Sequence, residues 1–208
     1  MTQAPDVLGA LWLQTLQRAV GRASHDVKDA LNGISVNLEV IRSRAARPDT
    51  PASAVMQFGD AATQQYERLA TLIDAVLSLA RAERDPADVA VTLRRIATLC
   101  SASATSADAA VRVVENEQVR TTLTSVRGEA LRLALTAPLL EIVTGSDRTR
   151  RATEVQCTVS GDEAMIHVII AAAGRNVGMP VGVGDVAHAA GVRWAQDAQK
   201  LTLAFPRA

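Results

Sequence analysis

The N-terminal part of the chain has the apolar spacing of long helices. Apolar residues recur at alternating steps of four and three positions, which makes a heptad-like seam. The members of this seam are Leu16, Val20, Ala23, Val27, Leu31, Ile34, Leu38, Ile41 and Ala45. Asp6 follows Pro5 and is a candidate N-cap, so the pattern predicts a helix over residues 6–46. With Val20 at heptad position a, His25 falls at position f, opposite the seam.

A second helix with the same spacing is predicted over residues 51–84. Its apolar positions are Val55, Ala62, Tyr66, Leu69, Ile73, Val76 and Ala80. Thr50 would cap this helix with Pro51 at its first position, and Pro86 would end it. Two amphipathic helices joined by a short turn cannot bury both apolar stripes alone. We therefore expect two copies of this hairpin to pair as a homodimeric four-helix bundle.

Beyond Pro86 the predicted elements become short and mixed. Helices are predicted over residues 89–99, 128–143 and 186–190, and Pro138 favours a kink or an early end of the second of these. Strands are predicted over residues 111–114, 123–126, 154–159, 165–170, 192–194 and 201–205. The fold class is therefore α+β. We expect a helical hairpin over residues 1–85 and an α/β sandwich domain over residues 86–208.

Composition and charge exclude several classes of function. Of the 208 residues, 48% are hydrophobic but only 2% are aromatic, so the core must consist of Ala, Val, Leu and Ile. The formal net charge is zero, which argues against binding nucleic acid or a membrane surface through bulk charge. No apolar stretch is long enough for a membrane span, and the start of the chain lacks the basic region of a secretory signal. Cys100 and Cys157 have no metal-ligand spacing, so we expect buried free thiols in a cytoplasmic protein.

The candidate chemistry lies around His25 on the predicted solvent face of the first helix. Residues 25–34 read His-Asp-Val-Lys-Asp-Ala-Leu-Asn-Gly-Ile. This segment resembles the H-box of the dimerisation and histidine-phosphotransfer domain of sensor histidine kinases, and residues 68–81 resemble the second helix of that domain. The box departs from the family pattern at Val27, Asp29 and Ala30, where Leu, Thr or Asn, and Pro are usual. The alternative is that His25 is an ordinary solvated surface histidine.

The element order of residues 86–208 resembles the ATP-binding domain of the same kinases. The resemblance implies an asparagine-bearing helix that holds Mg²⁺, but Ala137 and Glu141 stand where the asparagines belong. No acid occurs between Glu163 and Asp185 to read adenine, and no room is left for a lid. We therefore expect a degenerate ATPase-like domain without a nucleotide cofactor. The glycines of the following loop are interpreted as turn residues rather than a phosphate cradle: Gly178, Gly182 and Gly184.

A histidine bundle joined to a degenerate ATPase-like domain resembles the dimeric histidine phosphotransferases of phosphorelays, of the ChpT and sporulation-phosphotransferase type. The resemblance implies phosphoryl transfer between the aspartate of a receiver domain and His25, through a phosphohistidine intermediate. Asp26 is expected to orient the ring or accept its proton, and Lys28 to help neutralise the transferring group. The receiver of a response regulator or hybrid kinase would supply Mg²⁺, so we expect no metal ligands or cofactor in this chain.

The surface expected to dock a receiver consists of Arg22, Asp29, Asn32, Ser35 and Val36. Because the carboxylate of Asp29 would repel a phosphoryl group, we predict weak or no phosphatase activity. Two alternatives remain open. The chain is either a non-catalytic regulator that binds a kinase or receiver, or a kinase with an unusual ATP site.

The remaining histidines and a basic cluster are assigned structural roles. His167 lies in an apolar predicted strand and is expected to be a hydrogen-bonded structural residue. His188 is expected on an exposed short helix. Arg148, Arg150 and Arg151 are interpreted as a solvated turn, with a role in holding a receiver as the alternative.

Overall fold

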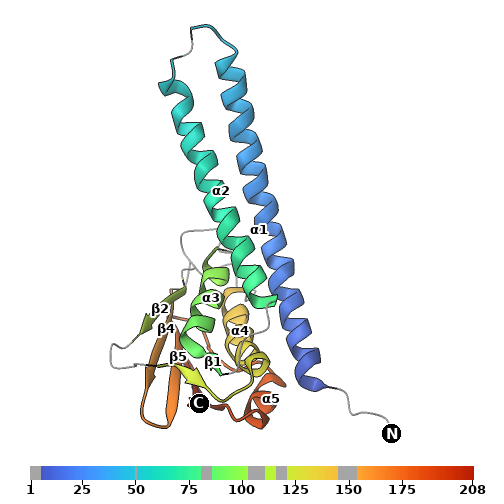
Figure 1. The fold of residues 1–208 in the computed structure, drawn as a ribbon, viewed down its shortest axis with the longest axis vertical. Helices are drawn as coiled ribbons and strands as arrows, with labels where there is room; N and C mark the ends of the chain where they lie inside the picture. The colour runs from blue at the N-terminus through green and yellow to red at the C-terminus, as the bar shows by residue number, and fades with distance from the viewer. Residues whose placement is uncertain (1–5, 50, 81–85, 103–110, 116–120, 145–153) are drawn as a thin grey trace.

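A computed structural model describes residues 6–49, 51–80, 86–102, 111–115, 121–144 and 154–208 of the chain. Its N-terminal part is a hairpin of two long helices, α1 (Val7–Ala45) and α2 (Ser53–Ala80), which stands out from the β-containing part (Figure 1). Asp6 caps α1, because its Oδ1 accepts the Gly9 N–H at 3.1 Å. Both long helices were predicted from the sequence and are present. Thr50, the predicted cap of the second helix, lies outside the described residues. Within the described ranges, no helix combines the length and apolar character needed to cross a membrane.

The seam that is buried within one chain differs from the predicted seam. The buried residues of the hairpin are Trp12, Thr15, Ala19, Ala23, Asp26 and Ala30 in α1, and Ala62, Leu72, Ala75 and Leu79 in α2. Val20, Leu31 and Leu38 of the predicted seam are instead exposed. The predicted seam followed the largest side chains. The chain buries the neighbouring alanine-rich face, because small side chains let two helix backbones approach closely.

The described residues of the C-terminal part form two sheets and three helices. Its elements are β1 (Ala87–Asp88), α3 (Val89–Ala102), β2 (Val111–Glu115), β3 (Leu123–Thr124), α4 (Gly128–Thr144), β4 (Val155–Gly161), β5 (Met165–Ala172), α5 (Val183–Ala189), β6 (Arg193–Asp197) and β7 (Lys200–Pro206). The larger sheet has the order β2-β4-β5-β7-β6; β2 pairs with β4 in parallel and the other pairs are antiparallel. Alternate residues of β5 and β7 are buried, so one face of the sheet packs on the core. The α+β class is confirmed.

Two details of this part differ from the sequence-based predictions: a short strand was not predicted, and the early end that was one of the two expectations at Pro138 does not occur. β1 is a two-residue strand paired with β3, too short to leave a pattern in the sequence. Pro138 does not end α4, which continues to Thr144. Residues 130–140 are all buried, and we attribute the intact helix to this packing, which offsets the hydrogen bond that proline removes.

The first turns of α1 are joined to α4 by polar and aromatic contacts. The Arg132 guanidinium lies over the Trp12 ring, 5.2 Å from its centroid. Arg18 forms an ion pair with Glu141, with 3.1 Å between Nη2 and Oε2. One apolar core includes Trp12 and Leu79 of the hairpin together with α3, α4 and the sheet. The base of the hairpin and the β-containing part therefore share a single core, with α1 running down beside α4 (Figure 1).

The two cysteines are buried free thiols, as expected. Burial raises the pKa of Cys100 and of Cys157 to about 12. At pH 8 only about one thiol in 10⁴ would then be ionised, and the thiolate is the reactive form. We predict that a chromogenic thiol reagent labels the native protein only as fast as the chain opens, whereas both thiols react at once in denaturant. Rapid labelling of both thiols in the native protein would contradict this burial.

Candidate functional site

His25 lies on the exposed side of α1, near the junction of the hairpin with the β-containing part. Its side chain is 75% exposed. The helix is continuous on both sides of it, so the imidazole stands on a rigid support. The predicted exposure of this ring to solvent is confirmed.

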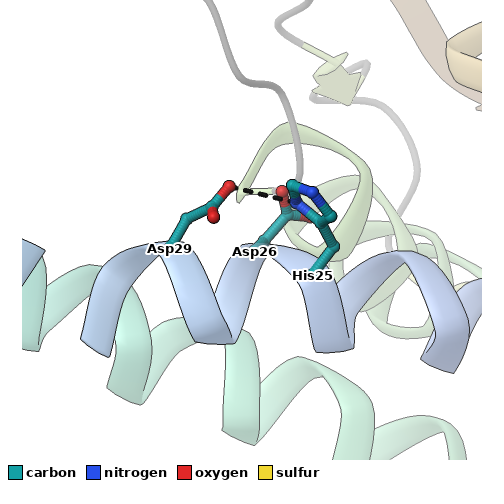
Figure 2. A group of neighbouring side chains, drawn as sticks. All are labelled: His25, Asp26 and Asp29. Carbon is teal, nitrogen blue, oxygen red and sulfur yellow. Dashed lines mark ion pairs between the residues drawn. The ribbon is translucent and has the colours of Figure 1, made fainter. Parts of the chain in front are cut away.

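The ring of His25 is held by Asp29. Nδ1 of His25 lies 3.0 Å from Oδ2 of Asp29 (Figure 2). A neutral imidazole that donates its Nδ1–H to this carboxylate keeps its free lone pair on Nε2. The sequence analysis expected Asp26 to orient the ring or accept its proton, whereas the contact at Nδ1 comes from Asp29. Adjacent residues point about 100° apart around a helix, whereas residues i and i+4 share a face.

Asp26 belongs to the buried face of α1. It is 3% exposed, and its Oδ2 has no hydrogen-bond partner within the part of the chain that the structure describes. Its carboxylate nevertheless lies next to the ring and to Asp29, because one ligand atom from each of His25, Asp26 and Asp29 lies within 4.8 Å of the others (Figure 2). The site therefore combines one exposed imidazole, one exposed carboxylate and one buried carboxylate.

The other predicted site residues follow His25 along α1. Lys28, Asn32, Ser35 and Val36 are exposed. Asn32 and Val36 stand seven and eleven residues after His25, and these spacings return to the same face of a helix. The structure thus places an accessible strip of mixed polar and apolar character beyond the imidazole.

Arg22 lies apart from this strip. Its side chain is half-buried. Burial raises the pKa of Cys100 in α3, and the positive charge of Arg22 lowers it to a lesser extent. The guanidinium is therefore close to the β-containing part rather than along the face beyond His25.

Ala137 and Glu141, the two residues of α4 that stand where asparagines were expected, have structural roles. Ala137 is buried in the core, and Glu141 forms the ion pair with Arg18 of α1. The contact of Glu141 with the hairpin was not predicted, because Arg18 and Glu141 are 123 positions apart and leave no signal in one sequence. Glu141 thus has a structural partner inside the chain.

The glycines of the loop before α5 have turn and packing roles. Gly182 has a positive φ of 79°, which few other residues tolerate. Gly184 lies against Trp194, whose Nε1–H donates to the Gly184 carbonyl at 3.2 Å. A Cβ added at Gly184 would lie 2.7 Å from Cζ2 of the indole. These contacts support the interpretation of both glycines as structural residues.

The other two histidines, His167 and His188, lie in the β-containing part. Nε2 of His167 is 3.3 Å from Oδ2 of Asp162 in the β4–β5 hairpin, so this histidine is hydrogen-bonded as predicted. His188 is exposed on α5, also as predicted. The arginine cluster at residues 148–151 lies outside the described residues.

Comparisons with known proteins return structural neighbours alone. Neither protein-family descriptions nor curated proteins match the chain. Three similar solved structures are the histidine kinase domain of the blue-light activated kinase of Erythrobacter litoralis EL346, the histidine kinase AdeS of Acinetobacter baumannii and a histidine kinase of Burkholderia phymatum STM815. Their identities are 13%, 13% and 15%, and their TM-scores 0.44, 0.39 and 0.41. The matches cover 92%, 88% and 93% of this chain and 94%, 97% and 97% of those chains. The features of this chain that bear on its function are His25 and the residues around it.

Proposed function

We propose that the protein is a phosphorelay histidine phosphotransferase that passes a phosphoryl group between receiver aspartates and His25, without ATP-dependent autokinase activity. One observation carries this proposal. Nδ1 of the exposed imidazole lies 3.0 Å from Oδ2 of Asp29. In a neutral ring this contact favours the proton on Nδ1, which leaves the lone pair on Nε2. The resemblance of residues 25–34 to the H-box adds support from the sequence.

The proposed reaction is a direct displacement at phosphorus. The Nε2 lone pair of His25 attacks the phosphorus of an aspartyl phosphate on the receiver. A bond forms between nitrogen and phosphorus, and the leaving carboxylate of the receiver keeps the electron pair of the broken P–O bond. The ring then carries a positive charge with its Nδ1 proton in place, and the nearby carboxylate of Asp29 stabilises that charge. The reverse path returns the phosphoryl group to an aspartate.

The surroundings of His25 suit a docking partner that brings its own metal. Receiver domains would supply Mg²⁺ from their acidic pocket. Lys28, one turn beyond His25, would help neutralise the transferring group, and the strip at Asn32, Ser35 and Val36 would contact the receiver. None of these contacts requires a nucleotide bound to this chain.

The test is transfer from a receiver labelled with ³²P on its aspartate, mixed with the protein and Mg²⁺. We expect the label to move to this chain and to be acid-labile and base-stable, as phosphohistidine is. Labelled ATP alone should leave the chain unlabelled. A complex with the receiver but no transfer would support a non-catalytic regulator instead, and label acquired from ATP would support a kinase.

We further propose that the protein is a homodimer joined through the hairpin. Each helix leaves an apolar stripe exposed: Leu13, Val20, Leu31 and Leu38 on α1, and Tyr66, Ile73 and Leu77 on α2. Covering these stripes with a second hairpin would remove them from water, at about 25 cal/mol for each Å² of apolar surface. A four-helix bundle is the arrangement that buries both.

Charged substitutions test the dimer. Leu31→Asp with Ile73→Asp places charges at side chains that are 47% and 44% exposed in the single chain. We predict that light scattering after size exclusion gives twice the 22.0 kDa chain mass for the wild type and the chain mass for this variant. Val36→Asp is the matched control, because Val36 is exposed on the His25 face and should leave the mass unchanged. A monomeric wild type would contradict the proposal.

A further inference from the structure

We propose that His25, Asp26 and Asp29 form a binding site for a divalent transition-metal ion of the zinc class, and that this ion switches off phosphoryl transfer. The first observation is their proximity, since one nitrogen and two carboxylate oxygens lie within 4.8 Å of one another. All three side chains come from two turns of α1 and converge on the same place (Figure 2). The metal site stands on this geometry, and only its regulatory effect rests on the proposed function.

The second observation is the state of Asp26. A carboxylate that is 3% exposed, with an oxygen that accepts no hydrogen bond from the residues described, is costly in a folded protein. The carboxylate of Asp26 lies beside the ring of His25 (Figure 2), and one of its oxygens is within 4.8 Å of a ring nitrogen of His25 and a carboxylate oxygen of Asp29. A cation between the three would compensate the buried charge. No such compensation is needed for Asp29, which already has the ring as its partner.

The ligand types indicate the class of metal. One imidazole nitrogen and two carboxylate oxygens are ligands of Zn²⁺ and related ions, whereas Mg²⁺ and Ca²⁺ prefer oxygen alone. Ligand atoms of a tetrahedral zinc site are about 3.3 Å apart. The ligand atoms here lie within 4.8 Å of one another, so side-chain rotations that shorten their separations by up to about 1.5 Å would close the group around an ion. Three protein ligands leave one position open to water or to a phosphate oxygen.

Metal binding at Nδ1 would change the chemistry of the ring. A neutral imidazole has one proton, and a metal on Nδ1 requires that proton to be on Nε2, exchanged through water. The lone pair that attacks phosphorus would then be lost. The imidazole of His25 would thus have two states. In one, Nδ1 is hydrogen-bonded to Asp29 and Nε2 is nucleophilic; in the other, Nδ1 binds the metal and Nε2 carries the proton.

Calorimetric titration of the metal-free full-length protein with Zn²⁺ tests the site. We expect one ion per chain for the wild type and no binding for His25→Ala. Asp26→Asn and Asp29→Asn should each weaken binding at least ~10-fold, since changes around a metal site commonly cost 10–100-fold in affinity. Glu39→Gln removes an exposed carboxylate elsewhere on α1 and should bind like the wild type. Unchanged binding in His25→Ala or in Asp26→Asn, or no binding in the wild type, would overturn the proposal.

Two further measurements separate the site from its effect. Nitrogen-15 spectra of the histidine side chains should show the His25 proton on Nδ1 without metal and on Nε2 with Zn²⁺; an unchanged tautomer would refute the switch. In the transfer assay, Zn²⁺ should block labelling of the wild type. Comparing each protein with and without Zn²⁺, the concentration that halves labelling should rise in Asp26→Asn by the same factor as its dissociation constant for Zn²⁺. If zinc binds as expected and no phosphoryl group is ever accepted, the proposed function fails and the metal site stands. If transfer occurs and zinc does not bind, the reverse holds.

Discussion

Replacing His25 by alanine is expected to abolish phosphoryl acceptance and to leave the fold intact. Of His25, Asp26 and Asp29, the imidazole is the stronger nucleophile that is exposed to a partner: Asp26 is buried, and one oxygen of the Asp29 carboxylate contacts the ring. Because the side chain is 75% exposed, its removal creates no cavity. Exposed substitutions and exposed ion pairs each contribute about 1 kcal/mol or less to the free energy of unfolding.

The measurement is acid-labile label per chain after incubation with a phosphorylated receiver. His188→Ala is the matched control, because it removes another exposed imidazole on a helix and should transfer like the wild type. Size exclusion and thermal unfolding should agree for all three proteins. Persistent acid-labile label on His25→Ala would place the chemistry at a different residue.

Replacing Asp29 by leucine is expected to slow transfer to His25 by about 10²-fold or more, within the range found for acid–base groups that position a reacting side chain. The variant loses the acceptor 3.0 Å from Nδ1, so the ring is no longer held in the tautomer that exposes Nε2. It also loses the charge that stabilises the phosphorylated, positively charged ring.

Asp29→Asn separates these two contributions. Its amide oxygen still accepts from Nδ1–H but carries no charge, so its rate should lie between those of the wild type and Asp29→Leu. Single-turnover rates at saturating phosphorylated receiver make the comparison, because they are insensitive to docking affinity. A leucine variant faster than the wild type would mean that the carboxylate mainly repels the incoming phosphoryl group.

The helices were predictable because their signals are local and repeated. Apolar steps of three and four residues continue through most of α1, and the predicted cap at Asp6 bonds to Gly9. The strands from β4 onward follow alternating patterns bounded by glycine and aspartate, and each was predicted within a few residues of its observed position. Pro138 shows the limit of such rules, because burial of α4 on all sides outweighs the local preference of proline.

The errors concern which face of a helix meets which neighbour. The sequence indicates an apolar stripe, but a stripe of alanines beside a stripe of larger residues does not reveal which of them the chain buries by itself. The same ambiguity concealed the contact of Asp29 with the His25 ring and the burial of Asp26, because these two residues lie at different angles around α1. The contact between Arg18 and Glu141 depends on the tertiary fold and has no local signal.

The shared core at the base of the hairpin has a practical consequence for work with fragments. A peptide that ends at residue 80 would expose Trp12, Ala19 and Leu79 to water, since these side chains pack with α3, α4 and the sheet in the whole chain. A fragment without the hairpin would lose Trp12, whose ring lies against Arg132, and Arg18, which pairs with Glu141. We expect neither fragment to fold as it does in the whole chain. Solubility and labelling should therefore be measured on the whole chain rather than on either fragment.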